Sequence, residues 1–213
     1  MKKTTMLGAA AALLALPVAA QAESFSLDAG VAATYTVTAD GFDHVENYGE
    51  GYVEGSYNGL FGGIWVASLY EDPTYDYELE LYAGYGNELA SGLSYSLTAT
   101  AYYLEDNYDD YYVTLELGYG LSDTLSLGGA VEFYPDSDIT DVSASVEYAF
   151  SDAISAYVLL GTVDDAVDYN YAEVGASYGF AEGAAFSLLY EDADNADATL
   201  SFILSYDFNV FGG

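Results

Sequence analysis

Cysteine is absent from the chain, and its 213 residues include only three prolines. Without cysteine, a disulfide framework cannot be what stabilises the fold. Hydrophobic residues nevertheless make up 52% of the chain. That share is too high for the low-hydrophobicity composition of a disordered chain, so we expect a folded protein.

Basic side chains are almost as scarce as cysteine. Lys2 and Lys3 are the only Lys or Arg residues, against 35 Asp and Glu, and the formal net charge is −33. Beyond residue 3, no salt bridge can involve Lys or Arg. Since neutralising phosphates requires these residues, the composition excludes nucleic-acid partners and disfavours anionic ligands.

Long apolar runs are also missing after residue 22. The chain starts with Lys2 and Lys3, continues with an apolar run over 6–19, and then places small residues before Ala22. This pattern predicts a secretory signal peptide over 1–22, cleaved after Ala22, which leaves 23–213 as the exported domain. A transmembrane anchor is the alternative, but the run is short for a span of about 20 residues. If the exported domain spans a membrane, it must do so as a closed barrel.

A period of two replaces the missing apolar runs. Within 74–85 one register carries Asp76, Glu78 and Glu80, and the other reads Tyr75, Tyr77, Leu79, Leu81, Ala83 and Tyr85. One polar and one apolar face predict a β-strand. In a soluble sheet the apolar face would point into a core. In an outer-membrane barrel it would meet lipid, with aromatics at both interfaces and the polar face lining the lumen.

The same alternation recurs along the chain and predicts about 12 strands, most of them about 9–11 residues long. The third strand, 60–70, is apolar on both faces near Trp65, which leaves its register open. Connections after odd-numbered strands are acidic, the longest being 38–47, and those after even-numbered strands are short. Antiparallel neighbours place these two sets at opposite ends, as in bacterial barrels with short periplasmic turns and charged outer loops.

These patterns predict an all-β protein. Residues 23–213 are expected to form a closed antiparallel up-and-down transmembrane β-barrel in the outer membrane of a Gram-negative bacterium. Its partners are then outer-membrane lipid and, during biogenesis, the barrel-assembly machinery. A soluble secreted sandwich is the remaining alternative, but Greek-key crossings give no reason for the parity of the connections. Oligomeric state is left open.

Several stretches carry a resemblance to known proteins. The terminal segment 204–208 (LSYDF) resembles the last strand of outer-membrane barrels, which tends to end in an aromatic residue. Segments 61–68 (FGGIWVAS), 78–85 (ELELYAGY) and 93–96 (LSYS) resemble the uncharacterised proteobacterial Gcw_chp family of exported proteins. That resemblance implies an outer-membrane location. The family has no established function and supplies no catalytic residues.

The lumen face is where we expect function to lie. The predicted register places these pore-lining candidates there: Asp76, Glu78, Glu80, Glu116, Glu132, Glu147 and Glu173. Without basic residues, such carboxylates must be hydrated, protonated or bound to cations. The favoured interpretation is a porin-like barrel for passive diffusion of small cations or polar solutes. The alternative is a structural or surface barrel with a closed lumen and acidic outer loops.

Metal binding and catalysis have weaker support. Asp192, Asp194 and Asp197 are clustered oxygen ligands of the kind that Ca²⁺ or Mg²⁺ prefers, but no EF-hand glycine or terminal Glu accompanies them. A solvated, self-repelling surface is the preferred interpretation. His44, in the predicted connection 38–47, is the only histidine. No nucleophile elbow, phosphate loop or metalloprotease signature occurs, so we expect neither an enzyme nor a bound cofactor.

Overall fold

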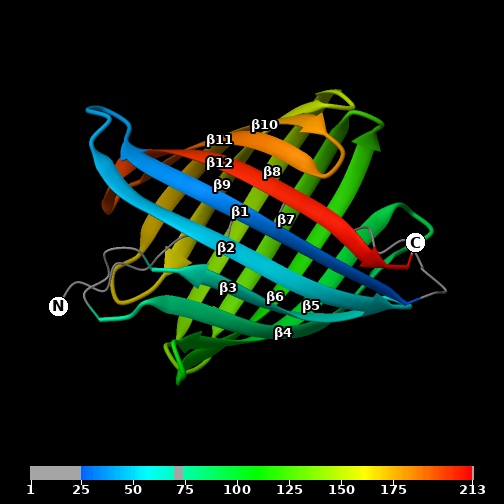
Figure 1. Ribbon diagram of the computed structural model, residues 1–213, viewed down its shortest axis with the longest axis horizontal. Coiled ribbons are helices and arrows are strands. Elements are labelled where there is room, and N and C mark those ends of the chain that lie inside the picture. The colour runs from blue at the N-terminus through cyan, green and yellow to red at the C-terminus, as the bar shows by residue number, and fades with distance from the viewer. Residues whose placement is uncertain (1–24, 70–73, 213) are drawn as a thin grey trace.

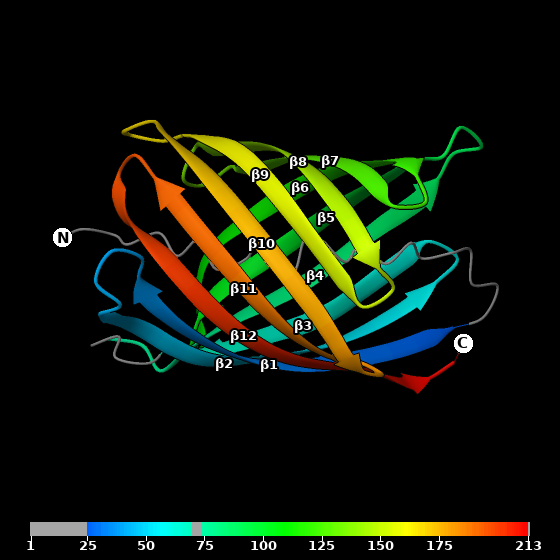
Figure 2. The same ribbon diagram turned by 90° about the horizontal axis from the view of Figure 1, so that it is seen from above.

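The computed structural model describes residues 25–69 and 74–212, which form a closed barrel of twelve strands. The strands are β1 Ser26–Thr38, β2 His44–Tyr57, β3 Leu60–Ser68, β4 Tyr77–Glu88, β5 Leu93–Leu104, β6 Asn107–Ser122, β7 Leu125–Tyr134, β8 Ile139–Ser151, β9 Ile154–Asp164, β10 Tyr169–Ala181, β11 Ala184–Ala193 and β12 Ala196–Phe211. Every neighbouring pair is antiparallel, and the strands are strongly tilted (Figures 1 and 2). The predicted fold class is confirmed. The predicted signal peptide lies outside the described residues.

The seam between β1 and β12 closes the sheet. It runs from Leu27 opposite Phe211 to Thr38 opposite Thr199, with one register shift after Leu27. Each strand therefore has a hydrogen-bonded neighbour on both sides, and no edge presents a row of unpaired backbone groups. Among the described residues, no helix is long and apolar enough to cross a bilayer.

The period of two separates an outer from an inner face. Large apolar side chains are exposed on the outside, including Val31 at 55%, Leu160 at 60% and Phe180 at 52%. The opposite register points into the barrel and contains buried polar groups such as Glu78 and Glu173. Such a barrel is apolar where lipid lies and polar in its lumen, the reverse of a soluble fold.

The register of β3, which the pattern left open, is decided by its neighbours. Trp65 pairs with Tyr52 on β2 and with Glu80 on β4, both of which face inward. Its indole Nε1 donates a hydrogen bond to Glu50 Oε2 over 3.1 Å. Ile64 therefore faces outward and is 50% exposed. An indole N–H needs an acceptor, and the lumen supplies one where lipid cannot.

The connections separate into two ends, as predicted. Those after odd-numbered strands lie at one end of the barrel, which we call the odd-loop end, and those after even-numbered strands lie at the even-loop end (Figure 1). The odd connections are 39–43, 69–76, 105–106, 135–138, 165–168 and 194–195, of which residues 70–73 lie outside the described residues.

Several acidic connections are shorter than predicted. β2 begins at His44, so the first connection is 39–43 and not 38–47, and Glu46 pairs with Thr36 inside the barrel. The acidic runs 105–110 and 191–197 are likewise predicted as connections, but β6 begins at Asn107, which leaves only 105–106 as a turn, and the last odd turn is 194–195. Acidic composition predicts solvated loops here, but backbone pairing continues through these runs.

Inward glycines accommodate large aromatic rings from the neighbouring strand. Tyr171 lies over Gly161, its direct cross-strand partner, and a Cβ at residue 161 would collide with the tyrosine ring. The same relation joins these pairs: Tyr157 over Gly175, Tyr52 over Gly30, Tyr82 over Gly63 and Phe61 over Gly84. The rings are thereby held against the wall instead of projecting across the lumen.

Gly161→Ala should destabilise the barrel by about 1–3 kcal/mol, because the added methyl group has to displace the Tyr171 ring. Urea unfolding of the refolded protein in detergent or vesicles measures this loss. Gly49→Ala is the matched control: Gly49 faces outward, and its Cβ would meet no atom closer than 3.9 Å. Equal stability changes in the two variants would contradict the proposed packing.

Candidate functional site

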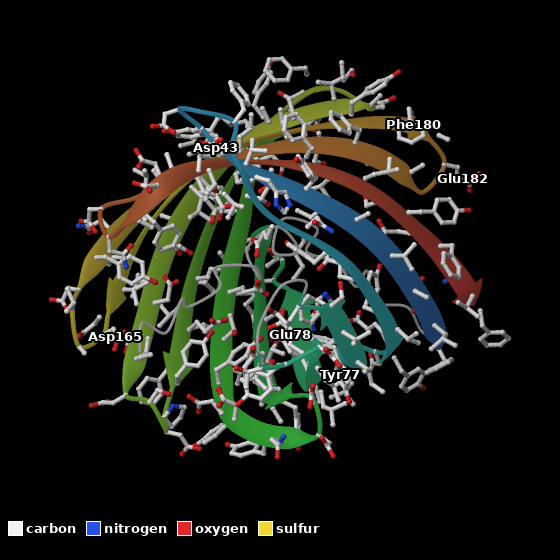
Figure 3. The ribbon with its side chains drawn as sticks, turned by 60° about the vertical axis from the view of Figure 1, so that its left-hand side comes forward. Asp43, Tyr77, Glu78, Asp165, Phe180 and Glu182 are labelled. Carbon is white, nitrogen blue, oxygen red and sulfur yellow. The ribbon has the colours of Figure 1, made fainter. Side chains whose placement is uncertain are left out.

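Inward carboxylates surround the lumen in the half of the barrel nearer the odd-loop end. We call this set the acidic ring; it comprises Glu46, Glu78, Glu80, Glu132, Asp141, Glu173 and Glu191. They come from β2, β4, β7, β8, β10 and β11. Figure 3, which is turned toward the odd-loop end, shows Glu78 inside the barrel.

Each member of the acidic ring lies within electrostatic range of the next. Glu46 interacts with Glu78, and Glu78 and Glu132 both interact with Glu80. The remaining interactions join Glu132 to Asp141, Asp141 to Glu173, Glu173 to Glu191 and Glu191 back to Glu46. Two of these pairs, Glu132 with Asp141 and Glu173 with Glu191, are direct cross-strand partners. The interactions therefore close a complete circuit around the lumen.

Tyrosine hydroxyls orient the carboxylates of the acidic ring. Tyr102 donates to Glu78 over 2.7 Å, and Tyr112 donates to Glu80 over 2.9 Å. Tyr171 on β10 crosses Gly161 on β9 and donates to both oxygens of Asp141 on β8, each over 3.0 Å. A phenol O–H can donate to a carboxylate without cancelling its charge. The ring is thus held in place and stays acidic.

No Lys or Arg side chain offsets the charge of the acidic ring, since Lys2 and Lys3 are the only such residues in the sequence. His44, the one histidine, interacts electrostatically with Glu46. Two unit charges about 6 Å apart repel each other by about 3 kcal/mol at an effective dielectric constant of about 20. Neighbours in the acidic ring can therefore be charged together only if water or mobile cations screen them. Such a ring of acidic side chains is one physical basis of cation selectivity in pores.

The structure brings some predicted pore-lining residues together and separates others. Glu78, Glu80, Glu132 and Glu173 are part of the acidic ring. Glu116 and Glu147 also face inward but lie nearer the even-loop end; Glu116 accepts a hydrogen bond from Ser96, and Glu147 pairs with Ser126 and Tyr157.

Asp76 is the exception, because it is exposed and precedes β4. Its backbone N–H donates to Glu105 Oε1 over 3.0 Å, so it belongs to the rim at the odd-loop end. Asp76 keeps the alternation of Glu78 and Glu80, and its backbone carbonyl accepts a hydrogen bond from Leu69 N–H over 2.9 Å, but its side chain is exposed one residue before β4.

Three residues of the acidic ring are not among the pore-lining candidates predicted from the sequence: Glu46, Asp141 and Glu191. Glu46 and Glu191 fall in predicted acidic connections, whereas pairing extends β2 and β11 through both positions. The signal that could identify them is the phase of the alternation: Glu46 has the parity of Glu50, and Asp141 has the parity of Glu147.

An apolar cluster lines the lumen beside Asp141 and Glu173. Leu159, Val163, Tyr169 and Tyr171 are buried there, and Ile139, Tyr157 and Ala193 pack against them. All of these have the inward parity of β8 to β11. The inner surface of the barrel therefore has two different parts. It is apolar and aromatic on β9 and β10, and it is predominantly polar on β4 to β7.

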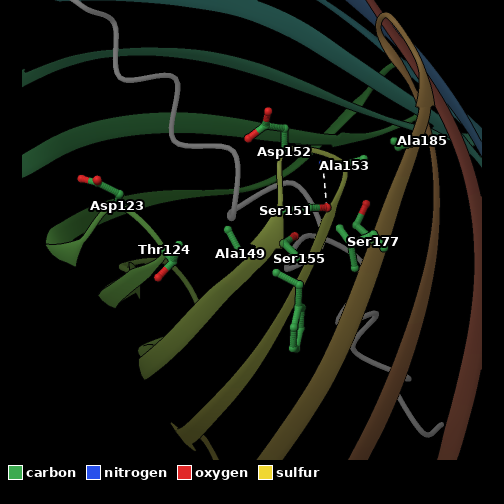
Figure 4. Close-up of a pocket in the computed structure, with 12 residues that line it drawn as sticks. Asp123, Thr124, Ala149, Ser151, Asp152, Ala153, Ser155, Ser177 and Ala185 are labelled. Carbon is green, nitrogen blue, oxygen red and sulfur yellow. Dashed lines mark hydrogen bonds between the residues drawn. The ribbon is translucent and has the colours of Figure 1, made fainter.

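The even-loop end differs from the acidic ring. A cavity of about 400 Å³ lies there against the turns 123–124 and 152–153 and is lined mainly by small side chains, among them Ser151, Ser155 and Ser177 (Figure 4). Large tyrosines are absent from its lining. The acidic ring and this cavity thus lie toward opposite ends of the barrel.

The weaker sequence candidates are not assembled into a site. Asp192 is exposed at the end of β11, and Asp194 accepts hydrogen bonds from the backbone and side chain of Asn170. Within 25–69 and 74–212, no three or more His, Cys, Asp or Glu residues are grouped so that they could hold a metal ion. Asp192, Asp194 and Asp197 therefore do not form such a group. His44 Nε2 shares a hydrogen bond with Asn47 Oδ1 over 3.1 Å, and its ring lies 5.2 Å from the Tyr35 ring at a tilt of 33°.

Glu173→Gln should raise the free energy of unfolding by about 1 kcal/mol at neutral pH, because it removes repulsion from Asp141 and Glu191 and supplies an N–H donor. Urea titration of the folded barrel measures this change. Glu116→Gln is the control, since Ser96 already satisfies its carboxylate. Equal or greater stabilisation by Glu116→Gln would contradict this account.

Comparison with known proteins identifies the fold but not a family. No family model and no curated relative matches the chain, so the Gcw_chp resemblance stays a prediction. Similar solved structures include the KdgM porin (TM-score 0.68, 12% identity, 84% of this chain and 99% of that one), which has also been solved in complex with disordered oligogalacturonate. Others are the NanC porin (0.60, 10%, 84% and 98%) and an outer membrane channel from Pseudomonas putida F1 (0.55, 14%, 86% and 95%). The chain shares the fold of porin-like barrels.

Proposed function

We propose that this protein is an outer-membrane porin-like channel through which small cations and polar solutes diffuse passively. The observation that carries the proposal is the acidic ring, a closed circuit of inward carboxylates in a barrel whose sequence contains no Lys or Arg after residue 3. Such a ring concentrates cations and repels anions.

The fold comparison supports a channel, and the charge supports its selectivity. Similar barrels are porins, one of them solved with oligogalacturonate, a polymer of sugar acids. The acidic ring would repel such a polyanion. We therefore infer that the same barrel architecture serves solutes of the opposite charge here. Outer-membrane lipid on the apolar outer face and export by the signal peptide over 1–22 belong to the same proposal.

A closed-lumen structural barrel is the second candidate function. It is favoured by the burial of Leu159, Val163 and Tyr169 inside the barrel, since these side chains fill lumen space near the odd-loop end. The acidic residues of the odd connections would then act at the cell surface. Insertion into a planar bilayer without any measurable conductance is the result that this candidate requires.

Combined neutralisation of Glu78, Glu80 and Asp141 to Gln, Gln and Asn should reduce the K⁺/Cl⁻ permeability ratio several-fold while channels still open, because it removes the charge of three members of the acidic ring. Reversal potentials in a KCl gradient measure the ratio. Glu182→Gln, at an exposed turn of the even-loop end, is the control. Unchanged selectivity in the triple variant, or no cation preference in the unmodified protein, would overturn the proposal.

A further inference from the structure

One arc of the acidic ring combines charge with an apolar surface. Asp141, Glu173 and Glu191 lie next to the apolar cluster of Leu159, Val163, Tyr169 and Tyr171. Leu159 is the direct cross-strand partner of Glu173 on β9, and Glu191 is its partner on β11. Elsewhere in the ring, Glu80 has Trp65 and Tyr102 as its cross-strand partners, and Glu78 has Ala67 and Leu104. There Tyr102 donates a hydrogen bond to Glu78 over 2.7 Å and Tyr112 donates one to Glu80 over 2.9 Å.

Glu173 is the centre of this arc, and its hydrogen bonding is incomplete. Its side chain is only 1% exposed. Oε2 accepts a hydrogen bond from the Tyr157 hydroxyl over 3.3 Å, but Oε1 has no partner among the described residues. The charged groups that face it from β8, β11 and β2 are Asp141, Glu191 and, through Glu191, Glu46, all of the same sign. A buried acceptor without a donor is costly, so the site calls for a cationic donor.

That donor has to come from outside the described barrel, because the sequence has no Lys or Arg after residue 3. A metal ion fits poorly, since no group of three or more suitable ligands occurs in the described part of the chain. An organic ammonium group fits better on two counts. Its N–H groups donate to carboxylates, and its methylene groups pack against Leu159 and the rings of Tyr157 and Tyr171.

We propose that this arc is a recognition site for linear alkyl oligoamines, organic cations with two or more amino groups, as they pass through the lumen. The proposal rests on the proposed cation channel and names its preferred solute. Two pairs of carboxylates here, Glu173 with Glu191 and Asp141 with Glu132, are cross-strand neighbours, whose Cβ atoms lie about 5 Å apart. Amino groups separated by a short methylene chain can therefore contact Glu173 and Glu191, or Asp141 and Glu132, at the same time.

Two dications of different chemistry test the proposal. Putrescine and Mg²⁺ carry the same charge, but only putrescine has methylene groups and N–H donors. In planar bilayers containing the full-length protein, putrescine should halve the K⁺ current at a concentration about tenfold lower than Mg²⁺. Equal potency would overturn the inference, because it means that charge alone is recognised.

Variants at the arc locate the site. Glu173→Gln combined with Asp141→Asn should raise the half-blocking putrescine concentration about tenfold, and Glu182→Gln should leave it unchanged. Tyr171→Phe keeps the aromatic ring and should preserve much of the putrescine preference over Mg²⁺, whereas Tyr171→Leu should abolish it. If Glu173 simply holds a proton, the Glu173→Gln change will not alter putrescine block, and the inference fails.

Failure of the channel and failure of the oligoamine site give different results. If the protein is cation-selective in KCl but putrescine and Mg²⁺ block it equally, the proposed channel is supported and the proposed oligoamine site is refuted. If the barrel does not conduct, calorimetric titration of the refolded protein with putrescine still tests the site. Heat of binding that is lost in the Glu173→Gln, Asp141→Asn variant would support the site without the channel, and absence of binding in the unmodified protein would remove it.

Discussion

The pairing of β1 with β12 is the contact on which the rest of the structure depends. It joins residues from opposite ends of the described chain and turns an open antiparallel sheet into a closed barrel. Only closure satisfies every strand edge, which a lipid environment requires. Closure also creates the lumen. Without it, the inward carboxylates of β2 and β11, such as Glu46 and Glu191, would lie far apart on a sheet instead of completing a ring.

The interior then has to accommodate side chains that repel each other. The protein uses tyrosine for this purpose, since the phenol group donates a hydrogen bond to a carboxylate but brings no opposite charge. Glycine at the cross-strand position, as at Gly161 below Tyr171, allows the ring to lie along the wall. One arrangement thus supports the carboxylates, holds the bulky rings aside and leaves the lumen negative. Stability and selectivity are consequently linked in the same residues.

The inward parity of the strands follows from the sequence, whereas the strand ends do not. Alternation located the strands and the inward parity of Glu78, Glu80, Glu132 and Glu173. It did not locate strand ends, because acidic composition resembles a loop even where Glu46 and Glu191 are paired in strands. It could not orient Trp65 either, since both faces of β3 are apolar and only the acceptor on Glu50 distinguishes them. Asp76 shows the converse case, an alternating residue whose side chain is exposed just before β4.

The sequence by itself determined that the chain alternates with a period of two, that its strands are even in number, and that no Lys or Arg after residue 3 compensates its acidic side chains. These are local or compositional properties, and each can be read without a partner strand. The tertiary structure alone decided which carboxylates meet, which strand ends are paired, and that an apolar cluster faces the lumen at Leu159 and Val163. Those outcomes depend on strand register and barrel closure, which join residues far apart in the chain. The uncompensated oxygen of Glu173 belongs to this second class, because its surroundings come from β9 and β11 as well as its own strand.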